Sequence, residues 1–201
     1  MLTIAIQAGG QSTRMGRDKA LVHLAGKPII EYVLQRVEGL GDEILITTNN
    51  PADYTYLGIR LEGDADPGAG SLPGLQTALK ASHYPYTLVL ACDMPFVSRP
   101  LLEFMIERMP HADIIVPQRQ GYFEPMHAIY SQRCLPSIKM TLDRGDTRVI
   151  SFYDQVQVRI INESELAQLD PHGMSFFNIN SPQDLTWAED YLRQHSDDKN
   201  A

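Results

Sequence analysis

Residues 3–19 read Thr3-Ile4-Ala5-Ile6-Gln7-Ala8-Gly9-Gly10-Gln11-Ser12-Thr13-Arg14-Met15-Gly16-Arg17-Asp18-Lys19. The apolar run 3–7 predicts a strand, and the glycines after it predict a loop that leads from this strand into a helix. That helix is expected to begin at Pro28, which suits a first helical turn, and to end at Gly39 and Gly41. A strand, a loop and a helix in this order indicate an α/β fold.

The same alternation continues along the rest of the chain. Strands are predicted near 43–48, 58–62, 86–92, 113–116, 127–130 and 156–161, and helices near 75–82, 100–109, 133–143 and from Pro182, with Ser181 as its N-cap. The run 86–92 is almost wholly apolar, as expected of a parallel strand that is buried on both faces. We predict a single Rossmann-like domain over 1–193, a three-layer sandwich with a mostly parallel sheet, and a frayed polar tail at 194–201.

Composition limits the possible function classes. The chain has 201 residues, of which 43% are apolar, and this is enough for one substantial core. Its net charge of −8 argues against partners such as nucleic acid or an anionic membrane surface. Cys92 and Cys134 are far apart in the sequence, which predicts reduced thiols and no zinc site. The N-terminal run lacks the basic residues of a signal peptide, and no apolar stretch approaches the roughly 20 residues of a membrane span. A cytoplasmic protein is expected.

The loop after the first strand has the composition of a phosphate site. Gly9 and Gly10 leave main-chain N–H groups accessible to an anion, and Arg14 and Lys19 add positive charge. Ala20 follows Lys19 where a P-loop needs Ser or Thr, and the G-x-G-x-x-G dinucleotide motif is absent from this loop. The structural alternative is a tight turn with solvated cations, but adjacent glycines and two spaced cations in one connection favour anion binding.

Asp93 ends the apolar run 86–92, where an open α/β sheet binds its ligands, and could hold magnesium against a triphosphate. Its structural alternative is a helix cap or a turn. Asn49 and Asp64 could hydrogen-bond a base or a ribose, although turn formation explains them almost as well, and Asp66 competes with Asp64.

Two later segments carry further candidates. His127 could act as a general base, but a single histidine beside an apolar strand is more often structural. Asn178 and Asn180 alternate along an extended segment, so both could point toward an acceptor; the alternative is a capping turn before the last helix. Cys92, in its buried run, is expected to be a small hydrophobic residue.

Taken together, these motifs carry a family resemblance. The run 8–21, followed by Gly26-Lys27-Pro28, resembles the signature of the molybdenum cofactor guanylyltransferases, a MobA-like family of the GT-A-like nucleotidyltransferase superfamily. The segments 70–75, 91–96 and 177–182 resemble that family's second Gly-Pro-rich loop, metal-binding strand end and Asn-rich turn. Gln7 departs from the pattern, because the family usually has an apolar residue there, and Ser71 and Pro73 vary the second loop.

The resemblance implies a role for each candidate. Catalysis is expected from Arg14, Lys19 and Asp93, and a magnesium ion is expected at Asp93. Nucleotide contacts are expected from Gln7, Ala8, Gly9, Gly10, Lys19, Asn49, Asp64 and Asp93. The pterin side is expected to include Glu124, His127, Asn178 and Asn180.

The reaction implied is transfer of GMP from GTP to the phosphate of molybdopterin, or of its molybdenum-loaded form, with release of pyrophosphate. Further expected partners are other molybdenum-cofactor biosynthesis proteins or recipient molybdoenzymes, and the chain is expected to be a monomer or a weak oligomer. The alternatives are a cytidylyltransferase for the same pterin, a sugar-nucleotide pyrophosphorylase, and a non-catalytic nucleotide-binding regulator. Lys19 and Asp93 together favour an enzyme, whereas no short motif encodes the base.

Overall fold

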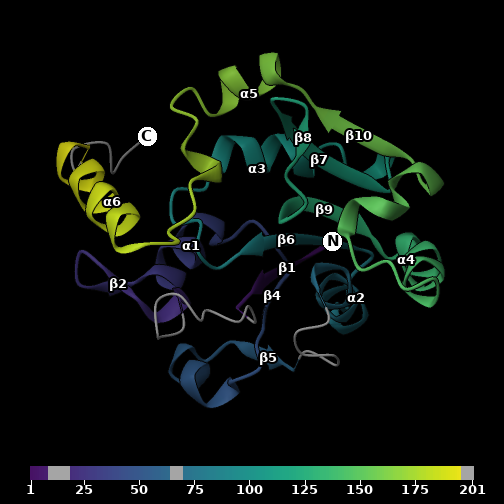
Figure 1. Ribbon diagram of the computed structural model, residues 1–201, viewed down its shortest axis with the longest axis horizontal. Helices are drawn as coiled ribbons and strands as arrows, with labels where there is room; N and C mark the ends of the chain where they lie inside the picture. Colours follow the sequence, from purple (N-terminus) through teal and green to yellow (C-terminus); the bar gives the residue numbers. More distant parts are fainter. Residues whose placement is uncertain (9–18, 64–69, 196–201) are drawn as a thin grey trace.

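One sheet forms the middle layer of the computed structural model, which describes residues 1–8, 19–63 and 70–195 (Figure 1). Its strands follow the order β10-β7-β9-β6-β1-β4-β5, with β8 paired to β7. The strand bounds are β1 (Leu2–Gln7), β4 (Glu43–Thr47), β5 (Arg60–Glu62), β6 (Tyr86–Ala91), β7 (Ile114–Arg119), β8 (Tyr122–Phe123), β9 (His127–Ser131) and β10 (Val158–Ile161). Strand β9 is antiparallel to both β6 and β7, whereas β1 is parallel to β4 and β6. The predicted mostly parallel sheet is confirmed.

Helices cover both faces of this sheet. The helices α1 (Ile29–Val37), α3 (Arg99–Ile106) and α5 (Glu163–Leu169) pack on one face, and α2 (Ser71–Ala81) and α4 (Leu135–Asp143) pack on the other. Strand alternation produces this division, because Leu88 and Leu90 of β6 belong to the first core and Val89 to the second. The predicted three-layer arrangement is thereby confirmed.

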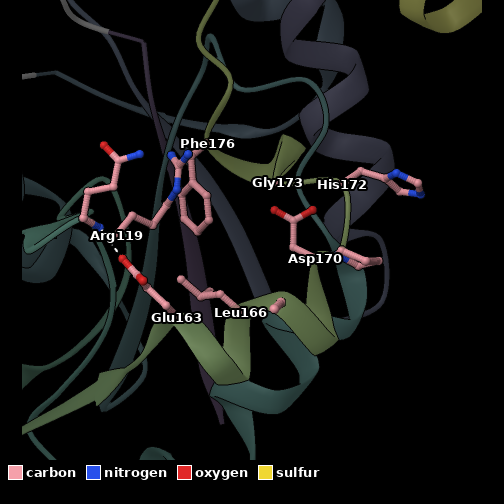
Figure 2. A pocket seen from close by; sticks show the side chains of 10 residues that line it. Arg119, Glu163, Leu166, Asp170, His172, Gly173 and Phe176 are labelled. Atoms are coloured by element: carbon pink, nitrogen blue, oxygen red, sulfur yellow. Dashed lines mark hydrogen bonds between the residues drawn. The ribbon is translucent and has the colours of Figure 1, made fainter.

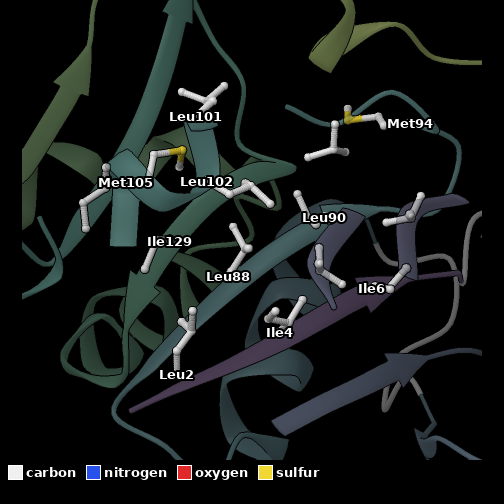
Figure 3. Packing of buried hydrophobic residues seen from close by; sticks show 14 of the residues in the cluster. Leu2, Ile4, Ile6, Leu88, Leu90, Met94, Leu101, Leu102, Met105 and Ile129 are labelled. Atoms are coloured by element: carbon white, nitrogen blue, oxygen red, sulfur yellow. The ribbon is translucent and has the colours of Figure 1, made fainter. Parts of the chain in front are cut away.

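The first core explains why β6 is almost wholly apolar. Leu88 and Leu90 lie between the sheet and the side chains of α3, and Ile4 of β1 lies beside them (Figure 3). Each is fully buried, and burying a leucine or isoleucine side chain stabilises the fold by about 1.5–3 kcal/mol. Strands β1 and β6 are therefore a rigid base for the residues that follow their carboxyl ends.

The last helix, α6 (Pro182–Gln194), packs at one end of the molecule against a small hairpin of β2 (His23–Leu24) and β3 (Lys27–Pro28) (Figure 1). Ser181 caps it as predicted, since its hydroxyl accepts a hydrogen bond from the amide of Asp184. Gln194, the first residue of the predicted tail, is still helical, and residues 196–201 lie outside the described residues. None of the described helices is long and apolar enough to cross a membrane.

Short 3-10 helices complete the chain. They are η1 (Lys19–Leu21), η2 (Pro51–Leu57), η3 (Met109–His111), η4 (Gln132–Cys134), η5 (Val149–Gln155) and η6 (Met174–Phe176). The sequence prediction lacked η5 and α5, and it began α2 too late, at Leu75 instead of Ser71. Helix α2 starts earlier because Pro73 is tolerated in a first turn and the amide of Leu72 donates to the carbonyl of Thr147.

The connections from β1 change direction along the sheet, and this makes the carboxyl end of β1 a topological switch point. The chain passes from β1 to β4 and β5 on one side and then returns to β6 on the other side. Ligands of open α/β sheets bind outside the carboxyl ends of the strands at such a point. Gln7 ends β1 opposite Ala91 of β6, so the residues after these two strands border the expected crevice.

Candidate active site

The strand ends around β1 are held together by main-chain hydrogen bonds. The amide of Cys92 donates to the carbonyl of Gln7 at 3.2 Å, and the amide of Ala8 donates to the carbonyl of Thr47 at 2.8 Å. These bonds continue the two ladders of β1 one residue further, through Ala8 on the β4 side and through Cys92 on the β6 side. Cys92 and Cys134 form no disulfide within the described ranges.

Lys19 and Asp93 form an ion pair at this edge, with 3.7 Å between Nζ and the carboxylate. Their side chains are 25% and 15% exposed, so both remain accessible from one side. Burial raises the pKa of the Asp93 carboxyl, and the neighbouring Lys19 ammonium opposes that shift. The predicted cation and the predicted metal ligand are thus adjacent, although they come from different loops.

The C-terminal segment completes this cluster. The amide side chain of Asn180 accepts a hydrogen bond from Lys19 Nζ, and the main-chain amide of Ile179 donates to the carbonyl of Asp93. Asn178 has a different partner, because its side chain donates to the carbonyl of Phe176 at 3.0 Å. Of the two asparagines, Asn180 contacts Lys19 of the predicted catalytic pair, and Asn178 stabilises the turn before it.

Glu124 and His127 lie farther along the same edge. Arg119 Nη1 is 3.4 Å from the Glu124 carboxylate; burial raises the pKa of this carboxyl, and Arg119 opposes the shift. His127 is fully buried, and its ring packs on Phe176 with 4.9 Å between the ring centroids. Burial lowers the pKa of His127 to about 3, and neither ring nitrogen has a hydrogen-bond partner in the described parts of the chain. The His127 ring thus lies behind Phe176, and its expected place on the pterin side stays a prediction.

A cavity of about 370 Å³ opens beside Phe176 (Figure 2). The Arg119 guanidinium lies over the Phe176 ring, 4.8 Å from its centroid, and both side chains line the cavity. Sequence reasoning did not single out either residue. The available signal was the position of Arg119 at the carboxyl end of β7, which runs in the same direction as β6 because both strands are antiparallel to β9.

Of the remaining candidate residues, one lies at the carboxyl edge of the sheet and the others lie outside the described residues. Asn49 follows β4 and is exposed, at the same carboxyl edge as Gln7. Gly9, Gly10, Arg14, Asp64 and Asp66 lie outside the described residues. Their assignment as phosphate and nucleotide contacts stays a prediction.

The residues around Asp93 fit a metal ion that is bound partly by substrate, but not one that is bound by protein ligands alone. No group of three His, Cys, Asp or Glu side chains gathers within the described ranges, so a metal held by protein ligands alone does not fit there. A largely buried carboxylate that is open from one side does fit magnesium, which is commonly held by one or two carboxylates together with substrate phosphates.

Comparisons with known proteins agree with this geometry. Residues 4–158 match the model of the MobA-like NTP transferase domain. A probable molybdenum cofactor guanylyltransferase from Pelotomaculum thermopropionicum is 34% identical over 92% of this chain and 91% of its own length. The molybdenum cofactor guanylyltransferase of Desulfosudis oleivorans is 35% identical over 94% of both chains.

Solved structures give the same result. Molybdopterin-guanine dinucleotide biosynthesis protein A from Archaeoglobus fulgidus superposes with a TM-score of 0.81 at 27% identity, covering 96% of this chain and 99% of that one. The 4-diphosphocytidyl-2C-methyl-D-erythritol synthase of Anaerococcus prevotii, at 15% identity and a TM-score of 0.72 over 96% of each chain, shares the fold alone. The chain therefore belongs to the MobA-like family of nucleotidyltransferases, the family of the molybdenum cofactor guanylyltransferases.

Proposed function

We propose that this protein transfers GMP from GTP to the phosphate of molybdopterin, or of the molybdenum-loaded cofactor, and releases pyrophosphate. The observation that carries the proposal is the contact of Lys19 with both Asp93 and Asn180 at the carboxyl edge of the sheet. The names of the curated relatives support the choice of guanylyl donor and pterin acceptor.

The chemistry needs positioning more than acid–base catalysis. A phosphate monoester is largely ionised at neutral pH, so its oxygen can attack the α-phosphorus of GTP without a strong base. A new phosphorus–oxygen bond forms, the bond between the α-phosphorus and the bridging oxygen breaks, and pyrophosphate leaves in line. The buried, neutral His127 is not required for any proton transfer.

Lys19 is suited to the charge that develops in this step. Its ammonium has three N–H donors, of which Asn180 accepts one, while Asp93 at 3.7 Å contributes mainly attraction. At least one donor therefore remains for a phosphate oxygen. Asp93 would at the same time hold a magnesium ion, which when bound would withdraw charge from the phosphate oxygens.

The acceptor is proposed to extend from Asp93 toward the cavity beside Phe176. Segment 176–180 runs from the cavity to Asn180, so a molecule lying along it would place its phosphate near Lys19. The Arg119 guanidinium on Phe176 offers a flat, polar surface, which suits a planar pterin ring. Glu124, paired with Arg119, lies beside this surface.

Pyrophosphate release with GTP, magnesium and the purified pterin acceptor tests the proposal. We expect release by the wild type, and a loss of at least about 100-fold for Lys19→Met and for Asp93→Asn, because charge stabilisation of this kind is worth that much. Lys139→Met is the matched control, since this exposed lysine pairs with Asp143 on α4, one turn away. Circular dichroism checks folding. Near-normal release by either site variant, or release with CTP equal to that with GTP, would contradict the proposal.

A further inference from the structure

Buried polar atoms without a hydrogen-bond partner are few among the described residues. They are Gln7 Nε2, Thr87 Oγ1 and the two ring nitrogens of His127. An unsatisfied buried donor costs about 1–3 kcal/mol, so each requires a reason. Thr87 lies inside β6 and His127 lies behind Phe176, whereas Gln7 ends β1 at the switch point of the sheet. A carboxamide donor is therefore left without a partner at the edge where ligands bind.

The position of Gly74 gives an independent reason to expect a ligand there. Gly74 lies in α2, where alanine would stabilise the helix by about 0.5–1 kcal/mol, and its φ is not positive. A Cβ atom at this position would lie 3.5 Å from Gln7 Oε1 and 3.7 Å from Gln7 Nε2. Glycine thus leaves space directly in front of the Gln7 carboxamide at a cost to the helix.

The residues proposed to contact the nucleotide lie toward opposite faces of the sheet. Strand alternation puts the Gln7 side chain on the α2 face with Ala5, where it meets Gly74. Lys19 lies next to Ala20, whose side chain belongs to the opposite, α1-side core. A nucleotide lying across the edge, with its phosphates at Lys19, would bring its base to the α2 side. A neutral carboxamide suits the edge of a base better than it suits a phosphate.

We propose that the Gln7 carboxamide, which replaces the apolar residue usual in the family, adds a base-specific contact in this chain, with Nε2 donating a hydrogen bond to a keto oxygen of the base, O6 of guanine, in the space left by Gly74. This inference rests on the proposed function. Adenine presents an amino group at the same position, so with the carboxamide oriented as in the structure Nε2 would meet a second donor and stay unsatisfied. The same argument excludes 2-aminopurine, which lacks O6, but tolerates hypoxanthine, which keeps it.

Calorimetric titration with three triphosphates tests the contact. Wild-type protein with magnesium should bind GTP and inosine triphosphate with similar affinity, and 2-aminopurine riboside triphosphate at least about tenfold more weakly. Gln7→Met, which keeps the length of the side chain, should bind GTP about tenfold more weakly and no longer distinguish GTP from the 2-aminopurine analogue. Gln168→Leu, on the far helix α5, is the matched control and should keep the wild-type pattern.

Gly74→Ala tests separately whether the nucleotide needs the space in front of the Gln7 carboxamide. It should raise the melting temperature of the free protein, because alanine favours the helix, and weaken binding of all three nucleotides. Gln7→Leu serves as a second apolar variant in case Gln7→Met does not fold. The melting temperature of each ligand-free protein shows whether it is folded. If the wild type binds GTP but Gln7→Met keeps its discrimination against the 2-aminopurine analogue, the Gln7 inference is wrong while the proposed function stands. If the wild type binds no GTP, both are wrong.

Discussion

The main-chain amide of Ile179 donates a hydrogen bond to the carbonyl oxygen of Asp93, with 3.0 Å between the two atoms. Asp93 follows the central strand β6, whereas Ile179 precedes α6, so this bond joins the sheet to the C-terminal segment. The next residue, Asn180, then reaches the Lys19 ammonium. The geometry of the proposed catalytic pair depends on residues distant in the sequence.

Asn180→Ala should lower kcat for pyrophosphate release by about tenfold, because a hydrogen bond to a charged group is worth about 1.5–3 kcal/mol. Its stability should change little, since the side chain is exposed. Asn178→Ala is the comparison: it loses a bond to the Phe176 carbonyl, and should mainly lower the free energy of unfolding. Equal losses of kcat in the two variants would contradict the distinction between them.

His127→Phe should make the fold less sensitive to acid. The pKa of His127 is about 3 in the fold and about 6.5 in the unfolded chain, so below pH 6.5 the unfolded chain binds the additional proton. Stability linked to this group is therefore complete above pH 6.5 and decreases toward pH 3, by about 2 kcal/mol between pH 7 and pH 5. Urea unfolding at these two pH values should show a smaller loss for the variant. An identical loss in both proteins would disprove the assignment.

Tyr130→Phe should destabilise the fold more than Tyr153→Phe. The two buried hydroxyl oxygens are 2.8 Å apart, and Tyr130 donates to the carbonyl of Pro125, so Tyr153 must donate to Tyr130. Removing the Tyr130 hydroxyl leaves two groups without a partner, at a cost of about 2–3 kcal/mol, against about 1 kcal/mol for Tyr153. Urea unfolding of both variants and of the double variant measures the difference and the coupling. A larger loss for Tyr153→Phe would reverse the assigned donor direction.

Gly70→Ala should lower the melting temperature. Gly70 has a φ of +114°, and an added Cβ would lie 2.9 Å from the side chain of Thr147. Gly145→Ala is the matched control, because Gly145 has a φ of +79° and no described atom within 4 Å of the added Cβ. Both variants bear backbone strain, of about 1–3 kcal/mol; Gly70, with a ψ of −178°, lies in a region essentially restricted to glycine, and only its variant also adds a clash. Similar melting temperatures would show that Thr147 moves aside freely.

The elements that the sequence predicted well are those with a clear period or a clear apolar run. Strand β6 follows from its composition, and α6 from Ser181 and Pro182 at its start. Helix α5 was missed although its capping box, Asn162 with Glu165, is a local signal, because the segment is short and polar. The early start of α2 depends on a bond from Leu72 to Thr147, which no local pattern reveals.

The residues of the candidate site also fall into those that the sequence predicted and those that only the fold reveals. The general rule for the carboxyl edge of a parallel sheet, with the family resemblance, brought Lys19 and Asp93 together correctly. The burial of His127 behind Phe176 could not be predicted, because it results from how η6 packs against β9. Arg119 was missed for the same reason, since only the fold places it over Phe176.

The reversed strand β9 has a consequence for what substitutions in this molecule can change. It stands between β6 and β7, and so separates the strands around the proposed nucleotide site from those beside the cavity at Phe176. Neither β7 nor β8 pairs with β1, whose partners are β4 and β6. Under the proposed function, substitutions beside the cavity at Phe176 would therefore alter acceptor recognition while leaving the strand pairing around the proposed nucleotide site unchanged.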